Sequence, residues 1–206
     1  MAERGNVYIV DDETIIRRSL VLLLGEAGYE CRPFASGSDF VEALDYIAPG
    51  CVLLDIHMPS LDGFSVQDAL LRLRPEMPVI FMTAAGSISA AVRVIKKGAV
   101  DYLEKPFSDE HLLELVENAQ LQLADMVQAA GRNSDAKRRI GRLTPRETEV
   151  LRTLLVGGDN KSVARTLDLS ARTVEMHRAN IMRKMEVRNF ATAVQIAVEA
   201  GLSTPS

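Results

Sequence analysis

The chain has 206 residues, of which 47% are hydrophobic and 25% charged, and its formal net charge is −4. Eight Pro and 13 Gly exclude a fibrous or low-complexity chain. No apolar run reaches the roughly 18–20 residues that a membrane span needs, and no apolar secretory signal begins the chain. We therefore expect a cytoplasmic protein without a membrane partner, long enough for one large core or two modest ones.

The two parts of the chain carry opposite net charges. Residues 137–206 carry 13 Lys and Arg against 7 Asp and Glu, a balance of +6. Residues 1–136 carry 11 against 21, a balance of −10. The acidic part therefore suits cations as partners, and the basic part suits polyanions such as nucleic acid.

The first part alternates short apolar segments with amphipathic ones. The unbroken apolar runs CVLL and PVIFM are typical of strands that are buried on both faces of a parallel sheet. Five strand–helix units predict an α/β doubly wound fold with a five-stranded parallel sheet, whose ligands bind beyond the carboxyl ends of the strands. We expect strands at 6–10, 29–34, 51–54, 78–82 and 100–103, and helices near 13–26, 36–47, 64–73, 87–97 and 108–124.

The pattern loosens between residues 125 and 141. The stretch QAAGRNSDAKRR has small, polar and basic residues without a sustained apolar stripe, which predicts a linker. A helix then begins at TPRE, where Thr144 is expected to be the N-cap. Pro145 takes the first helical position, and Glu147 can close a capping box.

The remaining residues contain no strand pattern. Gly157 and Gly158 are expected to end the first helix, Asn160 to cap the second and Ser170 to cap the third. A tight turn at DLS separates the second helix from the third, which predicts an all-α helix-turn-helix domain of four short helices. The later helices are expected at 161–168, 171–185 and 189–200.

Polar side chains stand at the ends of four predicted strands. Asp11 and Asp12 follow the first strand and Asp55 follows the third, while Thr83 ends the fourth and Lys105 follows the fifth. The carboxyl ends of parallel strands share one edge, and the first and third strands are neighbours in the common doubly wound order. Three carboxylates, a hydroxyl and an ammonium are therefore expected to converge.

Three carboxylates in close contact repel one another, which disfavours their joint ionisation. A hard divalent cation relieves this repulsion, and Mg²⁺ prefers a few carboxylates, retained waters and a substrate phosphate. A carboxylate can then act as a nucleophile and form an acyl phosphate. Because the metal and a Lys offset charge on the phosphoryl oxygens, these residue types predict Mg²⁺-dependent phosphoryl transfer.

The motifs IVDDE, LLDIHMPSLDG, FMTA and DYLEKPF, in this order and spacing, resemble the receiver domain of bacterial two-component response regulators. The resemblance covers about residues 4–124. It implies that Asp55 accepts a phosphoryl group from a sensor histidine kinase and lies at the Mg²⁺ site. Asp12 would be a direct metal ligand, and Asp11 would act largely through water.

The same resemblance implies roles for other residues of this pocket. The backbone carbonyl of His57 would be the third protein ligand of Mg²⁺, with its imidazole as the alternative ligand. Thr83 and Lys105 would contact the phosphoryl group. Tyr102 would be the switch aromatic, with simple packing as the alternative role, and the bond from Lys105 to Pro106 would be cis.

Residues 143–200 resemble the LuxR-type helix-turn-helix. Val174, Ile181, Met182 and Met185 are expected to form the buried stripe of its third helix, and the other side would enter the major groove of DNA. Arg and Lys fit phosphates or guanine, whereas Glu175 can accept from cytosine N4.

Many relatives place a basic residue at the base-reading positions, which Glu175, Met176 and Ala179 occupy in this chain. The better candidates for phosphate contacts are Lys161, Arg165, Arg172 and Thr173. The full set of expected DNA contacts is Lys161, Arg165, Arg172, Thr173, Glu175, Met176, Arg178 and Ala179.

Together the two parts resemble a full-length response regulator of the NarL/FixJ family, and the stretch MTAAGSISAAVRVIKKGAVDYLEKPF is most similar to the FixJ branch. The resemblance implies a receiver domain at 1–124, a linker at 125–141 and a DNA-binding domain at 142–206. Phosphorylation would switch homodimerisation and sequence-specific DNA binding to regulate transcription, with RNA polymerase as a further partner. The chain would catalyse only its own phosphoryl transfer and dephosphorylation.

Two other functions are compatible with part of the pattern. A haloacid-dehalogenase-like phosphatase would use Asp55 as its nucleophile, but that family needs an acid two residues later, where His57 stands. A phosphorylation-independent adaptor would bind protein through the C-terminal helices. Activation also has two possible routes, which are pairing of receivers through residues 87–120 and release of the DNA-binding helices, with 189–200 forming the dimer.

Overall fold

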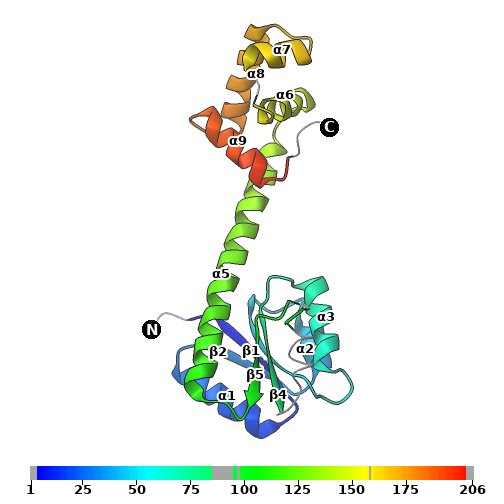
Figure 1. Cartoon of the computed structure of the whole chain (residues 1–206), viewed down its shortest axis with the longest axis vertical. Helices are drawn as coiled ribbons and strands as arrows, with labels where there is room; N and C mark the ends of the chain where they lie inside the picture. The colour runs from blue at the N-terminus through cyan, green and yellow to red at the C-terminus, as the bar shows by residue number, and fades with distance from the viewer. Residues whose placement is uncertain (1–3, 85–94, 97, 158, 203–206) are drawn as a thin grey trace. The chain divides into compact units, whose positions relative to one another are not determined.

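The structure is a computed structural model that describes residues 4–84, 95–96, 98–157 and 159–202. The chain divides into two compact units, the first ending at Val127 and the second beginning at Gln128 (Figure 1). The first unit is an α/β structure, and the second is entirely helical in its described part. No helix in the described ranges combines the length and the apolar character that a bilayer crossing requires.

The first unit is built on a parallel five-stranded sheet. Its strand order is β2-β1-β3-β4-β5, which confirms the predicted doubly wound arrangement with the first and third strands as neighbours. The strands are β1 (Asn6–Val10), β2 (Glu30–Phe34), β3 (Gly50–Asp55), β4 (Val79–Ala84) and β5 (Asp101–Lys105).

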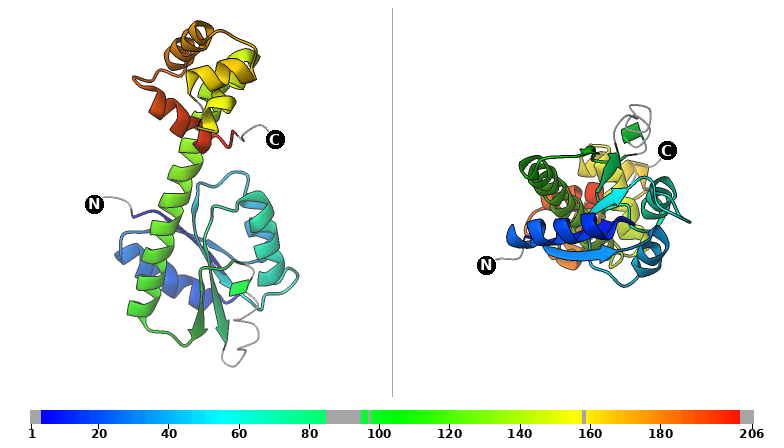
Figure 2. Two further views of the ribbon diagram at one scale, coloured as in Figure 1. Left: turned by 45° about the horizontal axis from the view of Figure 1, so that its top comes forward. Right: turned by 90° about the horizontal axis from the view of Figure 1, so that it is seen from below.

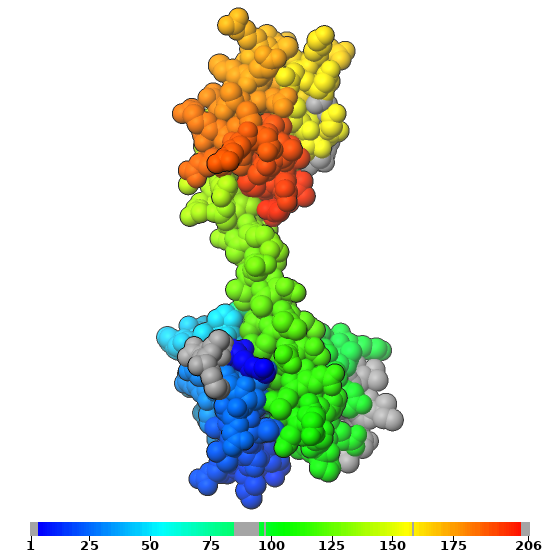
Figure 3. Space-filling model, turned by 90° about the vertical axis from the view of Figure 1, so that its left-hand side faces the viewer, coloured from blue at the N-terminus to red at the C-terminus, as the bar shows by residue number. Residues whose placement is uncertain are grey.

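Helices cover both faces of this sheet (Figures 1 and 2). One face packs against α1 and α5, which Figure 3 shows in blue and green on one side of the unit, and the other face packs against α2 and α3. The helix expected at 87–97 falls almost entirely outside the described residues. The helices of this unit are α1 (Thr14–Glu26), α2 (Gly37–Ala43), α3 (Gly63–Leu73) and α5 (Asp109–Ile140).

The alternation of side chains along β1 explains why its sequence is apolar from Val7 to Val10. Val7 and Ile9 pack with residues of α1 and α5, whereas Tyr8 and Val10 pack with residues of α2 and α3. Successive strand residues point to opposite faces, so a strand covered on both sides buries every residue. This burial makes the end of β1 a fixed support for the polar residues that follow.

The helix α5 is longer than the sequence analysis predicts. It continues through the expected linker segment to Ile140, and the boundary between the two units falls within it. Local pairs stabilise this exposed stretch, because residues four apart are neighbours on a helix surface. Asp135 accepts from Arg139 at 2.7 Å and from Arg138, and Arg132 donates to Gln128 at 2.9 Å. The expected loss of helix was wrong, since an apolar stripe is not needed where such pairs occur.

In the described residues of the second unit, the four helices that follow α5 pack around one apolar core, formed by residues such as Val150, Val163, Val174 and Ile181. Between α7 and α8, Asp168 has a φ of 52°, and this left-handed residue makes the tight turn that the DLS sequence predicts. The helices are α6 (Pro145–Leu155), α7 (Asn160–Thr166), α8 (Ala171–Lys184) and α9 (Phe190–Glu199).

Helix caps define where these helices begin. The predicted capping box is confirmed, since Thr144 accepts from the Glu147 N–H and Glu147 accepts from the Thr144 N–H. Ser170 caps α8 as predicted. The N-cap of α7 is Asp159, so the prediction of Asn160 was wrong by one residue; the carboxylate of Asp159 accepts from the Ser162 N–H at 2.7 Å.

The capping residue Glu147 also ties α6 to the end of α8. Its Oε2 accepts from Lys184 Nζ at 2.7 Å, and Glu147 is only 4% exposed. Burial acts to raise the pKa of this carboxyl, but the contacts with Lys184 and Thr144 outweigh it and hold the pKa below the usual value. Glu147 is therefore ionised and anchors the carboxyl end of α8.

Candidate functional site

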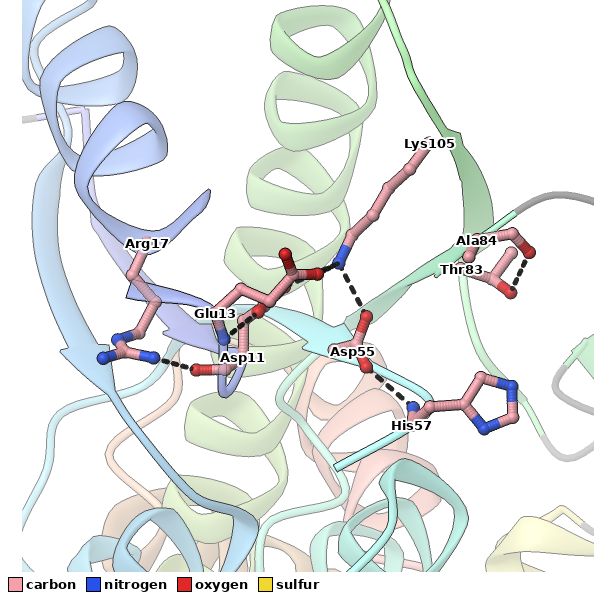
Figure 4. A network of polar contacts seen from close by, with 8 residues as sticks. All are labelled: Asp11, Glu13, Arg17, Asp55, His57, Thr83, Ala84 and Lys105. Carbon is pink, nitrogen blue, oxygen red and sulfur yellow. Dashed lines mark hydrogen bonds and ion pairs between the residues drawn. The ribbon is translucent and has the colours of Figure 1, made fainter. Parts of the chain in front are cut away.

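The polar site lies at the carboxyl edge of the sheet, at the switch point of the strand order (Figure 4). The register pairs Val10 of β1 with Leu54 of β3. The next residue along each strand is Asp11 or Asp55, so the register brings these two residues together. Lys105 ends β5 and reaches across to both. Asp11 is fully buried and Asp55 is 7% exposed. The predicted convergence of residues from β1, β3 and β5 is therefore confirmed.

The Lys105 ammonium bridges the two carboxylates. Its Nζ lies 2.8 Å from Asp11 Oδ2 and 2.7 Å from Asp55 Oδ1. Glu13 Oε1 lies 4.0 Å from the same nitrogen. One ammonium is thus shared by two buried carboxylates, so the cluster carries a net negative charge when both are ionised.

The shared ammonium explains the direction in which the pKa values of Asp55 and Lys105 are shifted. Burial raises the pKa of Asp55, helped by the neighbouring charge of Asp11, and the contact with Lys105 offsets only part of the increase. Burial acts to lower the pKa of Lys105, but its contacts with both carboxylates outweigh that effect and raise it. Lys105 therefore stays charged, while the fold destabilises the ionised form of Asp55 relative to the protonated form.

Backbone groups fix the orientation of both carboxylates. The His57 N–H donates to Asp55 Oδ2 at 2.7 Å, and the Glu13 N–H donates to Asp11 Oδ1 at 2.8 Å. Gly63, at the start of α3, allows the loop after β3 to close tightly: a Cβ there would lie 2.4 Å from the carbonyl oxygen of Asp55. A side chain at Gly63 would push α3 away from the site.

Arg17 is a residue of the site that the sequence analysis missed. Its guanidinium donates to the backbone carbonyl of Asp11 at 2.5 Å (Figure 4). It also donates to Thr14 Oγ1 at 3.0 Å. It therefore braces the turn that carries the acids. A signal was present, since Thr14 and Arg17 are three residues apart at the start of a helix and must share a face.

Thr83 and Tyr102 lie on the neighbouring strands β4 and β5. Thr83 is buried, and its hydroxyl donates to the carbonyl of Ala84 at 3.0 Å (Figure 4). Tyr102 is 39% exposed, so its ring is partly in solvent. The bond between Lys105 and Pro106 is cis, as the resemblance implies.

Asp12 does not join the buried pair. Its side chain is exposed, and no three Asp, Glu, His or Cys side chains form a metal-ligand cluster in the part of the chain that the structure describes. The expected convergence of three carboxylates was thus wrong for Asp12. Repulsion from Asp11 and the gain from hydration both favour an outward position for this carboxylate. The side chain of His57 is also exposed, while its N–H is engaged with Asp55.

The second candidate site is the outer face of α8. Val174, Ile181 and Met185 are fully buried, and Met182 is half-buried, so most of the expected stripe is in the core. The exposed residues of α8 are spaced three or four apart and share the opposite side of the helix. They are Arg172, Glu175, Met176, Ala179 and Arg183.

The other expected DNA contacts lie in different environments. Lys161 and Arg165 are exposed on α7. Thr173 is half-buried, and its hydroxyl lies 2.7 Å from that of the N-cap Ser170. Arg178 is also half-buried, and its guanidinium contacts other helices of the same unit, in contrast to the exposed position that the sequence analysis expects.

Comparison with known protein families assigns both units. Residues 7–117 match the response regulator receiver domain. Residues 141–197 match the luxR family of bacterial regulatory proteins. These two matches cover the acidic site and the α8 face respectively.

Relatives match along nearly the whole chain. The transcriptional regulatory protein FixJ of Bradyrhizobium diazoefficiens is 37% identical, over 98% of each chain. The response regulator protein TodT of Pseudomonas putida is 39% identical, over 95% of this chain and 87% of its own length.

Solved structures agree with these relatives. The response regulator StyR has a TM-score of 0.82 at 35% identity, over 95% of this chain and 98% of its own. Full-length FixJ from B. japonicum has a TM-score of 0.61 at 36% identity, over 98% of this chain and 99% of its own. The chain therefore belongs to the NarL/FixJ family of two-component response regulators, with a receiver domain followed by a LuxR-type DNA-binding domain.

Proposed function

We propose that Asp55 accepts a phosphoryl group from a sensor histidine kinase and that this modification switches DNA binding by the second unit. The supporting observation is the position of Lys105, whose ammonium lies between Asp11 and Asp55 beyond the carboxyl ends of the strands. A buried carboxylate next to a fixed ammonium suits a nucleophile that must carry a dianionic group.

The transfer would use the contacts already present at Asp55. A carboxylate oxygen attacks the phosphorus of a phosphohistidine, the P–N bond breaks, and its electron pair stays on the imidazole nitrogen. The His57 N–H holds one carboxylate oxygen in place, and Lys105 supplies positive charge beside the incoming phosphoryl oxygens. The chain would thus catalyse only its own phosphorylation and dephosphorylation.

The donor set fits Mg²⁺. Asp11 and Asp55 share one ammonium, and the nearby Asp12 adds an exposed carboxylate, so hard oxygen donors with excess negative charge are available. Asp12, Asp55 and the carbonyl of His57 would hold the ion directly, with Asp11 acting through water. Bound Mg²⁺ would supply charge neutralisation at the phosphoryl oxygens.

The switch would run through Thr83 and Tyr102. Thr83 would turn from the carbonyl of Ala84 towards a phosphoryl group on Asp55, and Tyr102 would move from solvent into the space that Thr83 leaves. This change would favour homodimers through the receiver surface at 87–120, of which residues 87–94 and 97 lie outside the described part of the chain. Release of the DNA-binding helices, with a dimer through α9, is the alternative. Sedimentation of residues 1–127 with and without beryllofluoride distinguishes the two, because only the first route pairs isolated receivers.

The outer face of α8 would read DNA bases in the major groove through Glu175, Met176 and Ala179, which are all exposed. Lys161, Arg165 and Arg172 would contact phosphates, and Thr173 would do so from the N-terminal turn of α8. Paired half-sites on DNA match a dimer, and RNA polymerase would be the partner through which the bound dimer regulates transcription. A protein that binds DNA and RNA polymerase would act in the cytoplasm.

A labelling experiment tests the proposed acceptor. The wild-type chain, incubated with Mg²⁺ and acetyl phosphate, should gain the mass of one phosphoryl group, which hydroxylamine removes because acyl phosphates are labile to it. Asp55→Asn should gain none, and Asp45→Asn, a change at an exposed carboxylate outside the site, should be labelled like the wild type. Undiminished labelling of Asp55→Asn, or a label resistant to hydroxylamine, would show a different acceptor.

A further inference from the structure

Arg178 occupies the inner side of the DNA-reading helix. Val174, Arg178, Ile181 and Met185 follow the spacing i, i+4, i+7 and i+11, which places all four on one stripe of α8. The three apolar members of this stripe are fully buried. An Arg in the middle of a buried stripe points towards the other helices of its own unit, not towards the groove of DNA.

Two contacts hold the Arg178 guanidinium there. Its Nη1 donates to Asn160 Oδ1 at 2.6 Å, and its Cζ lies 4.3 Å from the centroid of the Phe190 ring. Asn160 is the first residue of α7 and Phe190 is the first residue of α9. One side chain of α8 therefore contacts the starting residues of both flanking helices.

These contacts restrict how α8 sits within the unit. The apolar residues of the stripe pack without directional bonds, so they limit rotation of α8 about its axis less strictly than a hydrogen bond does. The guanidinium fixes a plane, because it must stack on Phe190 while one N–H points at Asn160. Glu175, Met176 and Ala179 are exposed on the same helix, so any rotation of α8 displaces them from the bases that they are proposed to read.

We infer that Arg178 is a positioning residue for DNA recognition: through Asn160 and Phe190 it sets the orientation of α8, and thereby the sequence specificity of binding. The inference rests on the proposed DNA-reading role of α8. Lys cannot replace Arg178 here, since its ammonium keeps the charge but neither stacks as a plane nor offers the same fork of donors. The substitution R178K therefore keeps the positive charge of the side chain and removes the planar geometry of the guanidinium.

The test uses the full-length chain in its beryllofluoride-activated state and two DNA duplexes. One duplex is the preferred sequence selected from a random library by the wild-type chain, and the other is a scrambled version of it. Dissociation constants are measured for the wild type, R178K, N160A and the R178K/N160A double variant. R152K is the matched control, because Arg152 is an exposed Arg on α6 of the same unit, outside the α8 face. Circular dichroism melting shows that each variant is folded at the assay temperature.

R178K and N160A are each expected to weaken binding to the preferred duplex about tenfold, the factor that corresponds to 1.4 kcal/mol. Binding to the scrambled duplex should change less than about twofold, because non-specific affinity follows the retained charge. The double variant should be no weaker than either single variant, since both remove the same contact. R152K should match the wild type on both duplexes.

Three results would overturn the inference. R178K could bind both duplexes like the wild type, which would mean that charge alone matters at this position. N160A could be without effect, or the losses of the two single variants could add in the double variant, and either result would separate Asn160 from Arg178. A wild-type chain that binds the two duplexes equally and weakly would instead contradict the proposed DNA-reading role of α8 itself.

Discussion

Lys105 Nζ lies 2.7 Å from Asp55 Oδ1 and at nearly the same distance from Asp11, so Asp55 has only a share of one ammonium. Burial raises the pKa of Asp55 despite this contact. The residue proposed to accept the phosphoryl group is therefore held in a strained electrostatic state, which any further positive charge in the pocket would relieve.

The first prediction concerns the stability of Asp55→Asn. A carboxyl whose pKa is raised by folding favours the folded state most when it is protonated, and that advantage is lost as the pH rises through the folded pKa. Asp55→Asn removes the cost of ionisation and can still accept from Lys105, so it should have a higher free energy of unfolding than the wild type at pH 7. The difference should shrink as the pH falls towards 3.8, the ordinary value for Asp.

Urea unfolding from pH 7 down to the acid limit of folding measures this difference. Asp45→Asn, at an exposed position, should show no comparable gain. An Asp55→Asn chain that is less stable than the wild type at pH 7 would mean that the contact with Lys105 outweighs the burial of the charge.

The second prediction ranks the acids of the Mg²⁺ site. Asp12→Ala should weaken Mg²⁺ binding more than Asp11→Ala, because Asp12 is exposed, whereas both Asp11 oxygens are already occupied by Lys105 and the Glu13 N–H. Removal of an indirect partner such as Asp11 is expected to cost about tenfold in affinity. Calorimetric titration with MgCl₂ gives the ranking, and a larger effect in Asp11→Ala would reverse the assigned roles.

The third prediction concerns Glu147, whose pKa is lowered by folding. Such a group stabilises the fold above its unfolded pKa, and the stabilisation is lost as the pH falls through the folded pKa. Glu147→Gln should therefore cost about 2 kcal/mol of unfolding free energy at pH 7, the order expected for buried hydrogen bonds to a charged group. The cost should diminish below about pH 4.5.

Chemical denaturation followed by circular dichroism across this pH range checks the prediction. Glu149→Gln provides the control, because its pair with Arg146 is half-exposed and contributes little. If Glu147→Gln and Glu149→Gln cost the same at pH 7, the buried contact with Lys184 has no special weight.

The fourth prediction separates base reading from phosphate contact. Changing Glu175 or Met176 to Ala should alter the preferred DNA sequence, because each side chain that reads a base edge contributes about 1–3 kcal/mol of discrimination. Lys161→Ala should weaken binding to all duplexes alike and lower the salt dependence by about one ion. Selection from a random duplex library provides the profiles. An unchanged preference profile in Glu175→Ala would mean that α8 lies differently in the groove.

Much of this architecture is predictable from the sequence, for local reasons. Unbroken apolar runs are typical of strands covered on both faces, and strand ends in a parallel sheet share an edge, so the residue pattern alone brings Asp11, Asp55 and Lys105 together. The capping box at Thr144 is equally local, since both hydrogen bonds join residues three apart.

The features that the sequence did not predict depend on competition between environments. Asp12 has the same residue type as Asp11, but its side chain lies in solvent. Asp11 and Asp12 are consecutive residues, and only Asp11 of the two contacts Lys105. The length of α5 depends on charged pairs such as Asp135 with Arg139, which an apolar periodicity ignores. The inward position of Arg178 was missed, although its spacing from Val174 and Ile181 places it on the inner side of α8.

In the proposed function, modification of Asp55 controls DNA binding, and a single binding experiment can measure this dependence. Fluorescence anisotropy gives the affinity of the full-length chain for its preferred duplex, with and without Mg²⁺ and beryllofluoride, for the wild type and Asp55→Asn. A complete switch from 1:99 to 99:1 needs about 5.5 kcal/mol, so even a partial switch should raise the wild-type affinity at least about tenfold. The affinity of Asp55→Asn should not change. A wild-type chain that does not respond, or an Asp55→Asn chain that responds equally, would contradict the account.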